Sequence, residues 1–391
     1  MKDPATEEID LSIVMPCLNE AETVGRCVDK ALKSLEDLGV RGEVLVADNG
    51  SADRSPEIAA RHGARVISVP RKGYGNALRA GIEAARGRWI VMGDADDSYD
   101  FSNLGPFVEQ LQRGFDLVMG CRLPAGGGTI VPGAMPWKHR WIGNPGLSFI
   151  GRLFFRCPVT DFYCGLRAFT SEAYRRLGLQ MRGMEFALEM VIKSTLLGLS
   201  ITEVPITLFR DGRSHPPHLR TWRDGWRSLR FMLLFSPRWL FLWPGLILLA
   251  LGLAGCIALA GSAVTVGRVV FDANTLLVSA MMLIVGFQVT FFALAIRSYC
   301  FSTGLLPASK SLSRILRLFT LERGIVMGAL SIVAGAAFLI AAVLKWKHAG
   351  FGQLSYPESL RLVIPAITLT TLGVQVVFSS FFLSILTLER D

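Results

Sequence analysis

The N-terminal half of the chain alternates short apolar runs with stretches whose apolar residues recur at helical spacing. The runs are three to six residues long and rich in Val, Ile and Leu, which is typical of buried strands in a largely parallel sheet. This alternation predicts a three-layer α/β domain, in which ligands bind at the carboxyl ends of the strands. The predicted strands are residues 11–15, 44–47, 64–69, 89–92 and 117–119.

The first predicted helix follows the strand at residues 11–15 and has apolar positions at helical spacing from Val24 to Leu38. Asn19 is followed three residues later by Glu22, and this spacing predicts an N-cap box in front of the helix. Gly39 is placed to end the helix, because glycine readily adopts the left-handed conformation that a helix end requires.

Beyond about residue 238 the pattern changes to long apolar runs without Lys, Arg, Asp or Glu. Four runs reach the roughly 20 residues that a helix needs to cross a bilayer. One such run could be a buried core helix, but four of them predict a membrane domain. The predicted spans are residues 239–267, 273–296, 324–344 and 362–388.

Basic residues are distributed unevenly around these spans. Seven arginines lie between residues 210 and 238, and five Lys or Arg residues lie between the second and third spans, whereas the link between the first two spans holds only Arg268. Because basic loops stay in the cytosol, this predicts a multi-pass membrane protein whose N-terminal domain and both termini are cytoplasmic, in the inner membrane if the source is bacterial. The polar, acidic start of the chain lacks the pattern of a signal peptide.

Two segments interleave tryptophan with basic residues, and they predict helices that lie in the membrane interface. One is residues 137–141, followed by the apolar run 147–155, and the other is residues 221–235. The net charge of +9 would also suit nucleic acid, but an anionic membrane surface is the simpler partner beside apolar spans, so no nucleic-acid partner is predicted. The predicted domains are therefore residues 1–217, an interfacial helix at 218–237 and a membrane domain at 238–391.

Asp94 and Asp96 directly follow the predicted strand 89–92, where ligands of such sheets gather. Two carboxylates one residue apart can both face a hard divalent cation that is shared with substrate phosphates. Such a cation would neutralise the charge on a departing nucleoside diphosphate. The pair predicts a site for Mg²⁺ or Mn²⁺, although a solvated acidic turn is the alternative for this motif taken alone.

Polar residues also end the first two predicted strands, and they extend the acidic motif into one binding rim. Pro16, Asn19 and Glu20 follow the first strand, and Asp48 and Asn49 follow the second. Carboxylates and amides at adjacent strand ends can hydrogen-bond a base and a ribose. Each group alone would be an ordinary turn.

Taken together, these motifs resemble glycosyltransferase family 2, whose catalytic domain has the GT-A fold. The pieces that carry the resemblance are SIVMPCLNEAETV, EVLVADNGSADRS and GYGNALRAGIEAARGRWIVMGDAD. Residues 120–122 (GCR), 161–169 (DFYCGLRAF) and 210–215 (RDGRSH) resemble its polyprenyl-phosphate hexosyltransferase branch, which includes dolichol-phosphate mannose synthase and bacterial undecaprenyl-phosphate glucosyltransferases. The resemblance implies an α/β GT-A domain followed by interfacial helices and four transmembrane helices.

The resemblance also implies roles for individual residues. Pro16, Glu20 and Asp48 would hold the nucleoside, while Asp94 and Asp96 would engage the metal and the diphosphate. Asp161 would orient the acceptor or the sugar, or else serve as a structural cap. Arg122, Arg167 and Arg210 would hold the acceptor phosphate or the diphosphate, and the remaining substrate-binding residues would be Asn19, Asn49 and Ser214. The implied catalytic set is Asp96, Arg122, Asp161, Arg167 and Arg210.

The sequence departs from this branch at two places. Asp97 and Ser98 stand where many relatives have leucine and glutamine, and His215 replaces a lysine in a segment that is one residue shorter. A third metal contact and a phosphate contact by His215 are therefore not predicted.

The expected chemistry needs no strong general base, because a lipid phosphate is already anionic. Positioning and charge stabilisation would dominate, and in-line attack on the anomeric carbon would invert its configuration. The expected reaction moves one hexose, glucose or mannose, from UDP-glucose or GDP-mannose to a polyprenyl (undecaprenyl or dolichyl) phosphate at the cytosolic membrane face. The sequence neither predicts nor excludes a homo-oligomer.

Three other functions fit the sequence less well. A processive polysaccharide synthase of the same family carries Q-x-x-R-W, but the Arg-Trp pairs at residues 140–141 and 238–239 lack the glutamine. A transporter with a nucleotide-binding domain would favour ionisable residues inside the spans, which these runs lack. A Rossmann oxidoreductase needs G-x-G-x-x-G, and Leu78 stands where the third glycine should be. Two alternatives remain: a family 2 transferase that acts on another lipid or polysaccharide acceptor, and a non-enzymatic membrane transporter subunit with a nucleotide-binding domain.

Overall fold

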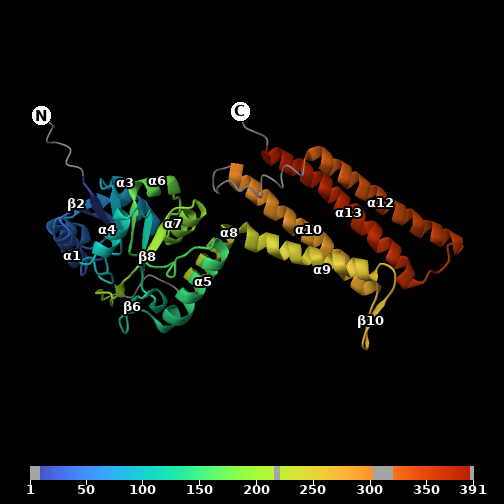
Figure 1. Ribbon diagram of the computed structural model, residues 1–391, viewed down its shortest axis with the longest axis horizontal. Helices are drawn as coiled ribbons and strands as arrows, with labels where there is room; N and C mark the ends of the chain where they lie inside the picture. Colours follow the sequence, from blue (N-terminus) through green and yellow to red (C-terminus); the bar gives the residue numbers. More distant parts are fainter. Residues whose placement is uncertain (1–8, 215–220, 303–319, 388–391) are drawn as a thin grey trace. The chain divides into compact units, whose positions relative to one another are not determined.

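The computed structural model describes residues 9–214, 221–302 and 320–387. The chain divides into two compact units, Met1–Phe235 and Ser236–Asp391, which are described separately (Figure 1). His215, where the sequence departs from the resembled branch, lies outside the described residues, as do the predicted domain boundary at residues 217–218 and the last residue of the fourth predicted span.

The first unit is built on a seven-stranded sheet in the order β3-β2-β1-β4-β7-β5-β8. Strand β7 runs antiparallel to both of its neighbours, and every other pairing in this sheet is parallel. All five predicted strands are confirmed, and β7 and β8 were not predicted. The strands are β1 (Leu11–Cys17), β2 (Gly42–Asp48), β3 (Arg65–Ser68), β4 (Trp89–Met92), β5 (Leu117–Cys121), β7 (Arg167–Thr170) and β8 (Ile201–Pro205). A short parallel pair, β6 (Thr129–Ile130) and β9 (Thr207–Leu208), forms a separate two-stranded sheet.

Successive residues of each central strand face two different apolar clusters. Ile13 and Met15 of β1 belong to one cluster, whereas Val14 belongs to the other. This alternation places a helical layer on each face of the sheet and confirms the predicted three-layer arrangement. One cluster draws on helices α1 (Val24–Asp37), α2 (Ser55–Arg61) and α4 (Gly105–Gln112), and the other on α3 (Tyr74–Ala84), α6 (Ser171–Leu177) and α7 (Glu185–Leu196).

The start of α1 differs from the prediction. Thr23 is the N-cap residue and makes no side-chain capping bond, so the predicted N-cap box of Asn19 and Glu22 is wrong. The Asn19 side chain instead accepts a hydrogen bond from the backbone N–H of Ala52, 33 residues away. The predicted end is confirmed, because Gly39 follows the helix with a positive φ of 60°.

Two helices of the first unit carry exposed aromatic side chains. Helix α5 (Asn144–Phe155) and helix α8 (Thr221–Leu234) contact each other, and α8 also contacts α7. Arg227 of α8 donates to Glu185 at the start of α7, with an Nε–Oε1 distance of 2.8 Å. The predicted helix at residues 221–235 therefore forms, but it packs into the first unit instead of forming a separate segment. Its Trp222 and Trp226 are exposed, as interfacial aromatics should be.

Within the described residues, the second unit contains four helices that are long and apolar enough to cross a membrane. The prediction of four spans is therefore confirmed in number and approximate position. They are α9 (Trp243–Leu259), preceded by a helical turn at Arg238–Leu242, α10 (Ala273–Ser302), α12 (Leu321–His348) and α13 (Tyr356–Thr387).

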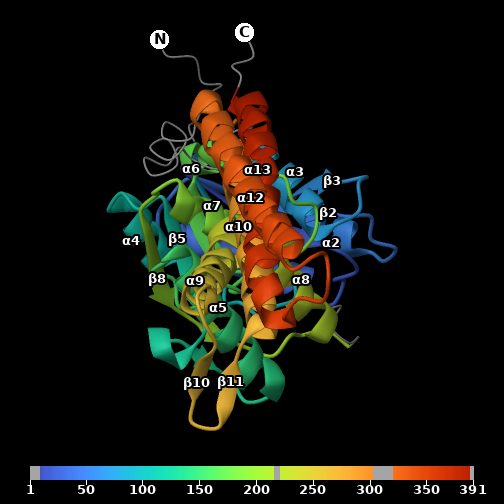
Figure 2. The ribbon, with the colours of Figure 1, turned by 90° about the vertical axis from the view of Figure 1, so that its right-hand side faces the viewer.

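The first predicted span, residues 239–267, is too long. Helix α9 ends at Leu259, and β10 (Val264–Val266) pairs antiparallel with β11 (Val269–Phe271). Figure 2 shows this hairpin extending from the end of α9. The segment is apolar, but its β-branched residues flank a tight turn at Gly267, where φ is +61°, and both features favour a hairpin over a helix.

Small residues allow the membrane helices to pack closely in pairs. A Cβ atom on Gly252 of α9 would lie 2.5 Å from the backbone nitrogen of Leu283 in α10. A Cβ atom on Gly328 of α12 would lie 2.7 Å from the carbonyl oxygen of Gly373 in α13. Such close backbone approach is the usual packing mode of membrane helices.

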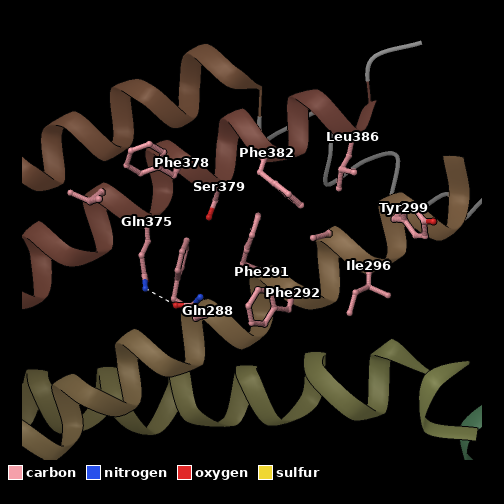
Figure 3. A pocket seen from close by; sticks show the side chains of 13 residues that line it. Gln288, Phe291, Phe292, Ile296, Tyr299, Gln375, Phe378, Ser379, Phe382 and Leu386 are labelled. Carbon is pink, nitrogen blue, oxygen red and sulfur yellow. Dashed lines mark hydrogen bonds between the residues drawn. The ribbon is translucent and has the colours of Figure 1, made fainter. Parts of the chain in front are cut away.

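A pocket of about 620 Å³ lies between α10 and α13 (Figure 3). Its walls are mainly aromatic, with Phe291 and Phe292 from α10 and Phe378 and Phe382 from α13. Gln375 of α13 donates to Gln288 of α10 at 2.9 Å, and Figure 3 shows this bond at one end of the pocket. The two amides thus join the helices through a polar contact within an apolar unit.

Candidate active site

The carboxyl ends of β1, β2 and β4 lie at one edge of the sheet. Strand β1 pairs with both of the others, with Cys17 opposite Asp48 and Val14 opposite Met92. The loops that follow these strands therefore start next to one another, as the sequence predicted. They carry Asn19 and Glu20, Asp48 and Asn49, and Asp94 and Asp96.

Asp48 is the last residue of β2 and is nearly buried. Its Oδ1 accepts from the Ser51 hydroxyl at 2.5 Å, and its Oδ2 accepts from the Gly50 backbone N–H at 3.1 Å. The preceding strand and this local turn fix the carboxylate at the rim. Pro16 lies within the sheet opposite Ala47, and Cys17 is opposite Asp48. The side chain is thus preorganised for a polar ligand.

The two predicted amide ligands hold loops together. Asn49 donates to the carbonyl oxygens of Val69 and Arg71, and its own Oδ1 accepts from the Gly73 N–H at 2.7 Å. Asn19 adopts a positive φ of 60°, and its backbone N–H donates to Ser51. These asparagines shape the rim by joining neighbouring loops.

Asp94 is partly buried and lies against Tyr74 and the backbone at Gly165. The Tyr74 hydroxyl donates to Asp94 Oδ1 at 2.9 Å. A Cβ atom at Gly165 would lie 2.8 Å from Asp94 Oδ2, so the backbone at that point passes close to the carboxylate. Burial, and then the charge of Asp96, raise the pKa of Asp94 to about 6, although Tyr74 opposes this shift. A nearby cation would favour the ionised form.

Asp96 is paired with an arginine that the sequence analysis did not select. Arg213 Nη2 lies 2.7 Å from Asp96 Oδ2, and Arg213 Nη1 lies 2.9 Å from Glu20 Oε1. The other oxygen of Asp96 accepts from both the backbone N–H and the hydroxyl of Ser98. The guanidinium thus joins the β1 end of the rim to the β4 end.

Asp97 does not join the other two aspartates. It has a positive φ of 63°, and its carboxylate pairs with Lys30 of α1 at 2.7 Å and with Arg26 at 3.6 Å. The conformation of this residue separates its side chain from those of its neighbours. The Asp97 carboxylate thus pairs with two basic residues of α1.

Arg122 and Asp161 form a buried ion pair with each other. Arg122 Nε and Nη2 donate to the two Asp161 oxygens at 2.7 and 2.9 Å, and the Arg122 backbone N–H also donates to Asp161. Asp161 is 0% exposed, and its Oδ1 also accepts from Tyr163. Burial opposes ionisation of Asp161, but the Arg122 charge and these hydrogen bonds hold its pKa below the ordinary value. Arg122 and Asp161 satisfy each other's charge and hydrogen bonds, which favours the structural role for Asp161.

Arg167 lies in the protein interior. It is 0% exposed, and its Nη1 and Nη2 donate to the carbonyl oxygens of Ala187 and Cys164. Burial lowers the pKa of its guanidinium. Arg167 therefore braces β7 against α7 and the preceding loop, and the structure does not bring it to the rim surface.

Arg210 and Ser214 lie on the segment that follows β9. Arg210 is exposed, and its Nε donates to the carbonyl oxygen of Pro132 at 2.7 Å. Ser214 donates through its backbone N–H and its hydroxyl to the Glu22 carboxylate, at 2.8 and 2.7 Å. Of the three arginines selected from the sequence, Arg210 alone has an exposed guanidinium.

Three rim residues were not predicted from the sequence: Tyr74, Arg213 and Glu22. Tyr74 lies within the quoted GYG motif, and Arg213 lies three residues after Arg210, so both were inside recognised segments. Their partners are 20 and 117 residues away in the sequence, and no local spacing signals such pairs. Glu22 was assigned to a helix cap because its spacing from Asn19 fits that motif.

The rim suits a divalent cation that is shared with a substrate. Among the described residues, no group of three or more His, Cys, Asp or Glu side chains is arranged to hold a metal by itself. Mg²⁺ is commonly held by one or two carboxylates together with substrate phosphates and water, which matches Asp94 and Asp96. The Arg213 guanidinium between Glu20 and Asp96 shows that a positive charge is accommodated there.

Comparison with known proteins gives two family matches. Residues 12–178 match the family "Glycosyl transferase family 2", and residues 294–387 match the family "Glycosyltransferase family 2 C-terminal transmembrane region". A crystal structure of glucosyl-3-phosphoglycerate synthase from Mycobacterium tuberculosis, solved with Mg²⁺ and uridine-diphosphate, is 22% identical with a TM-score of 0.45 and covers 58% of this chain and 79% of that one.

Two curated archaeal proteins from Haloferax volcanii are more similar in sequence. The low-salt glycan biosynthesis hexosyltransferase Agl6 is 37% identical over 380 residues, which is 95% of this chain and 88% of that protein. The dolichyl-phosphate hexose transferase is 32% identical over 197 residues, which is 50% of this chain and 82% of that protein. With a hexosyltransferase relative along nearly its whole length, this chain belongs to glycosyltransferase family 2, as an enzyme with a GT-A-type domain and a membrane domain.

Proposed function

We propose that this enzyme transfers a single hexose, glucose or mannose, from a nucleoside diphosphate sugar to a polyprenyl phosphate, with inversion at the anomeric carbon. The observation that carries the proposal is the rim formed by three adjacent parallel strands, where Asp48 ends β2, Glu20 follows β1, and Asp94 and Asp96 follow β4. The name of the related dolichyl-phosphate hexose transferase supports a lipid phosphate as acceptor.

The donor would lie along the rim from β2 to β4. Asp48, which is held by its turn, suits the hydroxyls of a ribose. Glu20 follows the neighbouring strand β1 and is linked to Asp96 by Arg213, which contacts both carboxylates. Asp94 and Asp96 would hold Mg²⁺ or Mn²⁺, which would neutralise charge on the departing diphosphate when bound. The Tyr74 hydroxyl, which donates to Asp94 at 2.9 Å, would hold this carboxylate in position at that end of the donor.

The acceptor would need a cationic group with an accessible guanidinium. Arg210 meets this requirement, whereas Arg122 and Arg167 are committed to internal partners. We infer that Arg122 and Arg167 stabilise the loops around the site and that Arg210 contacts phosphate. Because a lipid phosphate is already ionised, the buried Asp161 is not required as a general base.

The membrane location supports the same acceptor. Four apolar helices would anchor the enzyme where polyprenyl phosphates are found, and the basic links indicate that the catalytic domain is cytoplasmic. Exposed Trp222 and Trp226 on α8 would lie at headgroup depth.

The test is a transfer assay with purified full-length enzyme, a polyprenyl phosphate and a panel of labelled UDP- and GDP-hexoses, with and without Mg²⁺ or Mn²⁺. We expect one donor to give a singly glycosylated lipid, and only with a cation. Asp96→Asn should lower the rate by about a hundredfold or more, because charge stabilisation at the leaving group is lost. Asp100→Asn is the matched control, since within the described part of the chain the Asp100 carboxylate accepts hydrogen bonds only from the neighbouring Ser102.

Two results would contradict the proposal at different levels. Absence of transfer to any polyprenyl phosphate from any donor in the panel would remove the acceptor assignment. Full activity of Asp96→Asn, or full activity with a chelator present, would remove the metal assignment while leaving the family membership intact.

A further inference from the structure

We propose that Arg213 is a built-in counter-cation that occupies the cation-binding side of Asp96 in the absence of donor and must be displaced when a divalent cation binds. This inference rests on the proposed metal site of Asp94 and Asp96, and it adds a competitor that belongs to the chain itself.

The contacts of Arg213 use all parts of its guanidinium. Nη1 meets Glu20 at 2.9 Å, Nη2 meets Asp96 at 2.7 Å and Nε meets Asp211 at 3.2 Å. Its side chain is 13% exposed, so these ion pairs are largely shielded from water. Charge-assisted hydrogen bonds in such a setting are stronger than those at an open surface.

Both oxygens of Asp96 are committed in this arrangement. Oδ1 accepts two hydrogen bonds from Ser98, at 2.6 and 3.0 Å, and Oδ2 faces Arg213. The Ser98 bonds are local to the loop and hold the carboxylate in place. Arg213 comes from 117 residues away, so its contact is the one that can be exchanged without unfolding the loop.

The segment carrying Arg213 is fastened on both sides of that residue. The backbone N–H groups of Phe209 and Gly212 donate to the carbonyl oxygens of Ser98 and Asp96, and Ser214 is bound to Glu22. The Arg213 side chain can therefore leave Asp96 while the backbone stays attached to the rim. The exchange is a local movement of one flexible side chain.

Electrostatics explain why a guanidinium occupies this position. Glu20, Asp94 and Asp96 gather at one strand edge, and like charges at short range disfavour ionisation. Arg213 offsets this charge in the donor-free protein, and a divalent cation would do so when bound. Two positive groups cannot share Asp96 Oδ2 at low cost, so binding of the cation and the Arg213 contact are mutually exclusive.

The exchange has a consequence for the donor. Once displaced, the Arg213 guanidinium remains tethered beside the cation and beside Glu20, where it can meet an anionic oxygen of the incoming diphosphate. Arginine suits that role because its planar fork binds phosphate oxygens in pairs. Arg213 is thus a positioning residue that links cation binding to donor binding.

The experiment is a titration of full-length protein in detergent with Mn²⁺ alone, with free Mn²⁺ measured by electron paramagnetic resonance and without donor or acceptor. Asp96→Asn identifies the binding that belongs to this site. We expect Arg213→Gln to bind Mn²⁺ there at least about threefold more tightly than the wild type, because a partly buried competitor is removed. Arg213→Lys should lie between the two, since an ammonium keeps the charge but cannot span both carboxylates.

The matched control is Arg65→Gln. Arg65 also pairs with a glutamate at 2.7 Å, but it is the first residue of β3 and Glu43 is the second of β2, so this pair lies at the opposite edge of the sheet. Its Mn²⁺ affinity should equal that of the wild type. Unchanged or weaker Mn²⁺ binding by Arg213→Gln would overturn the inference, because a purely structural Arg213 or a cation-supporting one gives those results.

The outcome is separable from that of the proposed function. Mn²⁺ binding is measured without any lipid or sugar, so tighter binding by Arg213→Gln stands even if no polyprenyl phosphate is a substrate. Conversely, lipid glycosylation by the wild type together with unchanged Mn²⁺ affinity of Arg213→Gln would refute the competition alone.

Discussion

At the scale of single residues, the buried pair of Arg122 and Asp161 shows how a site residue can act by supporting a loop. Each partner satisfies the other, and neither is accessible in the described arrangement. This pairing could not be predicted, because Asp161 lies 39 residues beyond Arg122 and an arginine in a motif has the same local sequence whether it binds phosphate or an internal carboxylate. The acidic motif was predictable because both aspartates lie together directly after one apolar strand.

We predict that Asp161→Asn destabilises the protein by about 3 kcal/mol or more, since it leaves the buried Arg122 charge without its partner. The melting temperature of the first unit, measured by thermal unfolding of the protein in detergent, reports this loss. Replacing both residues with apolar ones, as in Arg122→Met with Asp161→Leu, should recover a large part of it. A stable but inactive Asp161→Asn would instead assign Asp161 to the reacting groups.

The same pair predicts a dependence of stability on pH. The pKa of Asp161 is lower in the folded protein than in the unfolded chain, so the folded state is favoured wherever the unfolded carboxylate is ionised. This contribution is complete above about pH 5 and decreases as the pH falls through the unfolded and then the folded pKa. Denaturant unfolding from pH 7 to pH 3 should show a shallower loss of stability for Asp161→Asn than for the wild type. Equal slopes would exclude the pair as a source of acid sensitivity.

At the scale of secondary structure, apolar runs identified five strands of the sheet, whereas two strands that carry charged residues were missed. The parallel strands β1 to β5 were found because each is an apolar run. Strand β7 is four residues long and begins with Arg167, so it looked like part of a binding motif. Strand β8 carries Thr202 and Glu203 and lies at the sheet edge, where one face needs no apolar residue. The β10–β11 hairpin was counted as helix because apolar composition alone does not separate the two.

The pairing of α12 with α13 depends on the absence of side chains at their crossing. A Cβ atom at Gly373 would lie 2.6 Å from the Gly328 carbonyl oxygen and 2.7 Å from Ile332. Gly373→Leu should therefore separate the helices and lower the apparent melting temperature in detergent, at a cost of about 1–3 kcal/mol for overpacking. Gly261→Leu is the control, because nothing lies within 4 Å of a Cβ at that position. Equal melting temperatures of the two variants would show that this crossing is not tightly packed.

At the scale of the whole molecule, the change in composition near residue 238 predicted the division into two units, and the structure divides the chain at Phe235 and Ser236. What composition could not predict is that α8 belongs to the first unit. That assignment depends on contacts with α5 and α7, including the pair of Arg227 with Glu185, which join segments distant in sequence.

The exposed tryptophans of α8 lead to a prediction about the acceptor. Trp222 is 83% exposed, so its loss should leave stability unchanged, while an interfacial contact would be weakened. Trp222→Ala combined with Trp226→Ala should raise KM for a long-chain polyprenyl phosphate by about fivefold to tenfold, with little change in kcat. A short-chain, water-soluble acceptor analogue is the internal control. An equal effect on both acceptors would place the tryptophans outside lipid recognition.

The distribution of basic residues also predicts which side of the membrane each link occupies. Arg268 is the only basic residue between the first two spans, whereas the link after α10 holds several, so the β10–β11 hairpin should face away from the cytosol. Arg268→Cys should react with a membrane-impermeant maleimide in intact cells. Arg54→Cys, at an exposed position of the first unit, should react only after the membrane is permeabilised. The five cysteines of the first unit are buried, so their background labelling should be low. Labelling of Arg54→Cys in intact cells would reverse the topology and, with it, place the nucleotide-sugar rim on the side of the membrane where such donors are scarce.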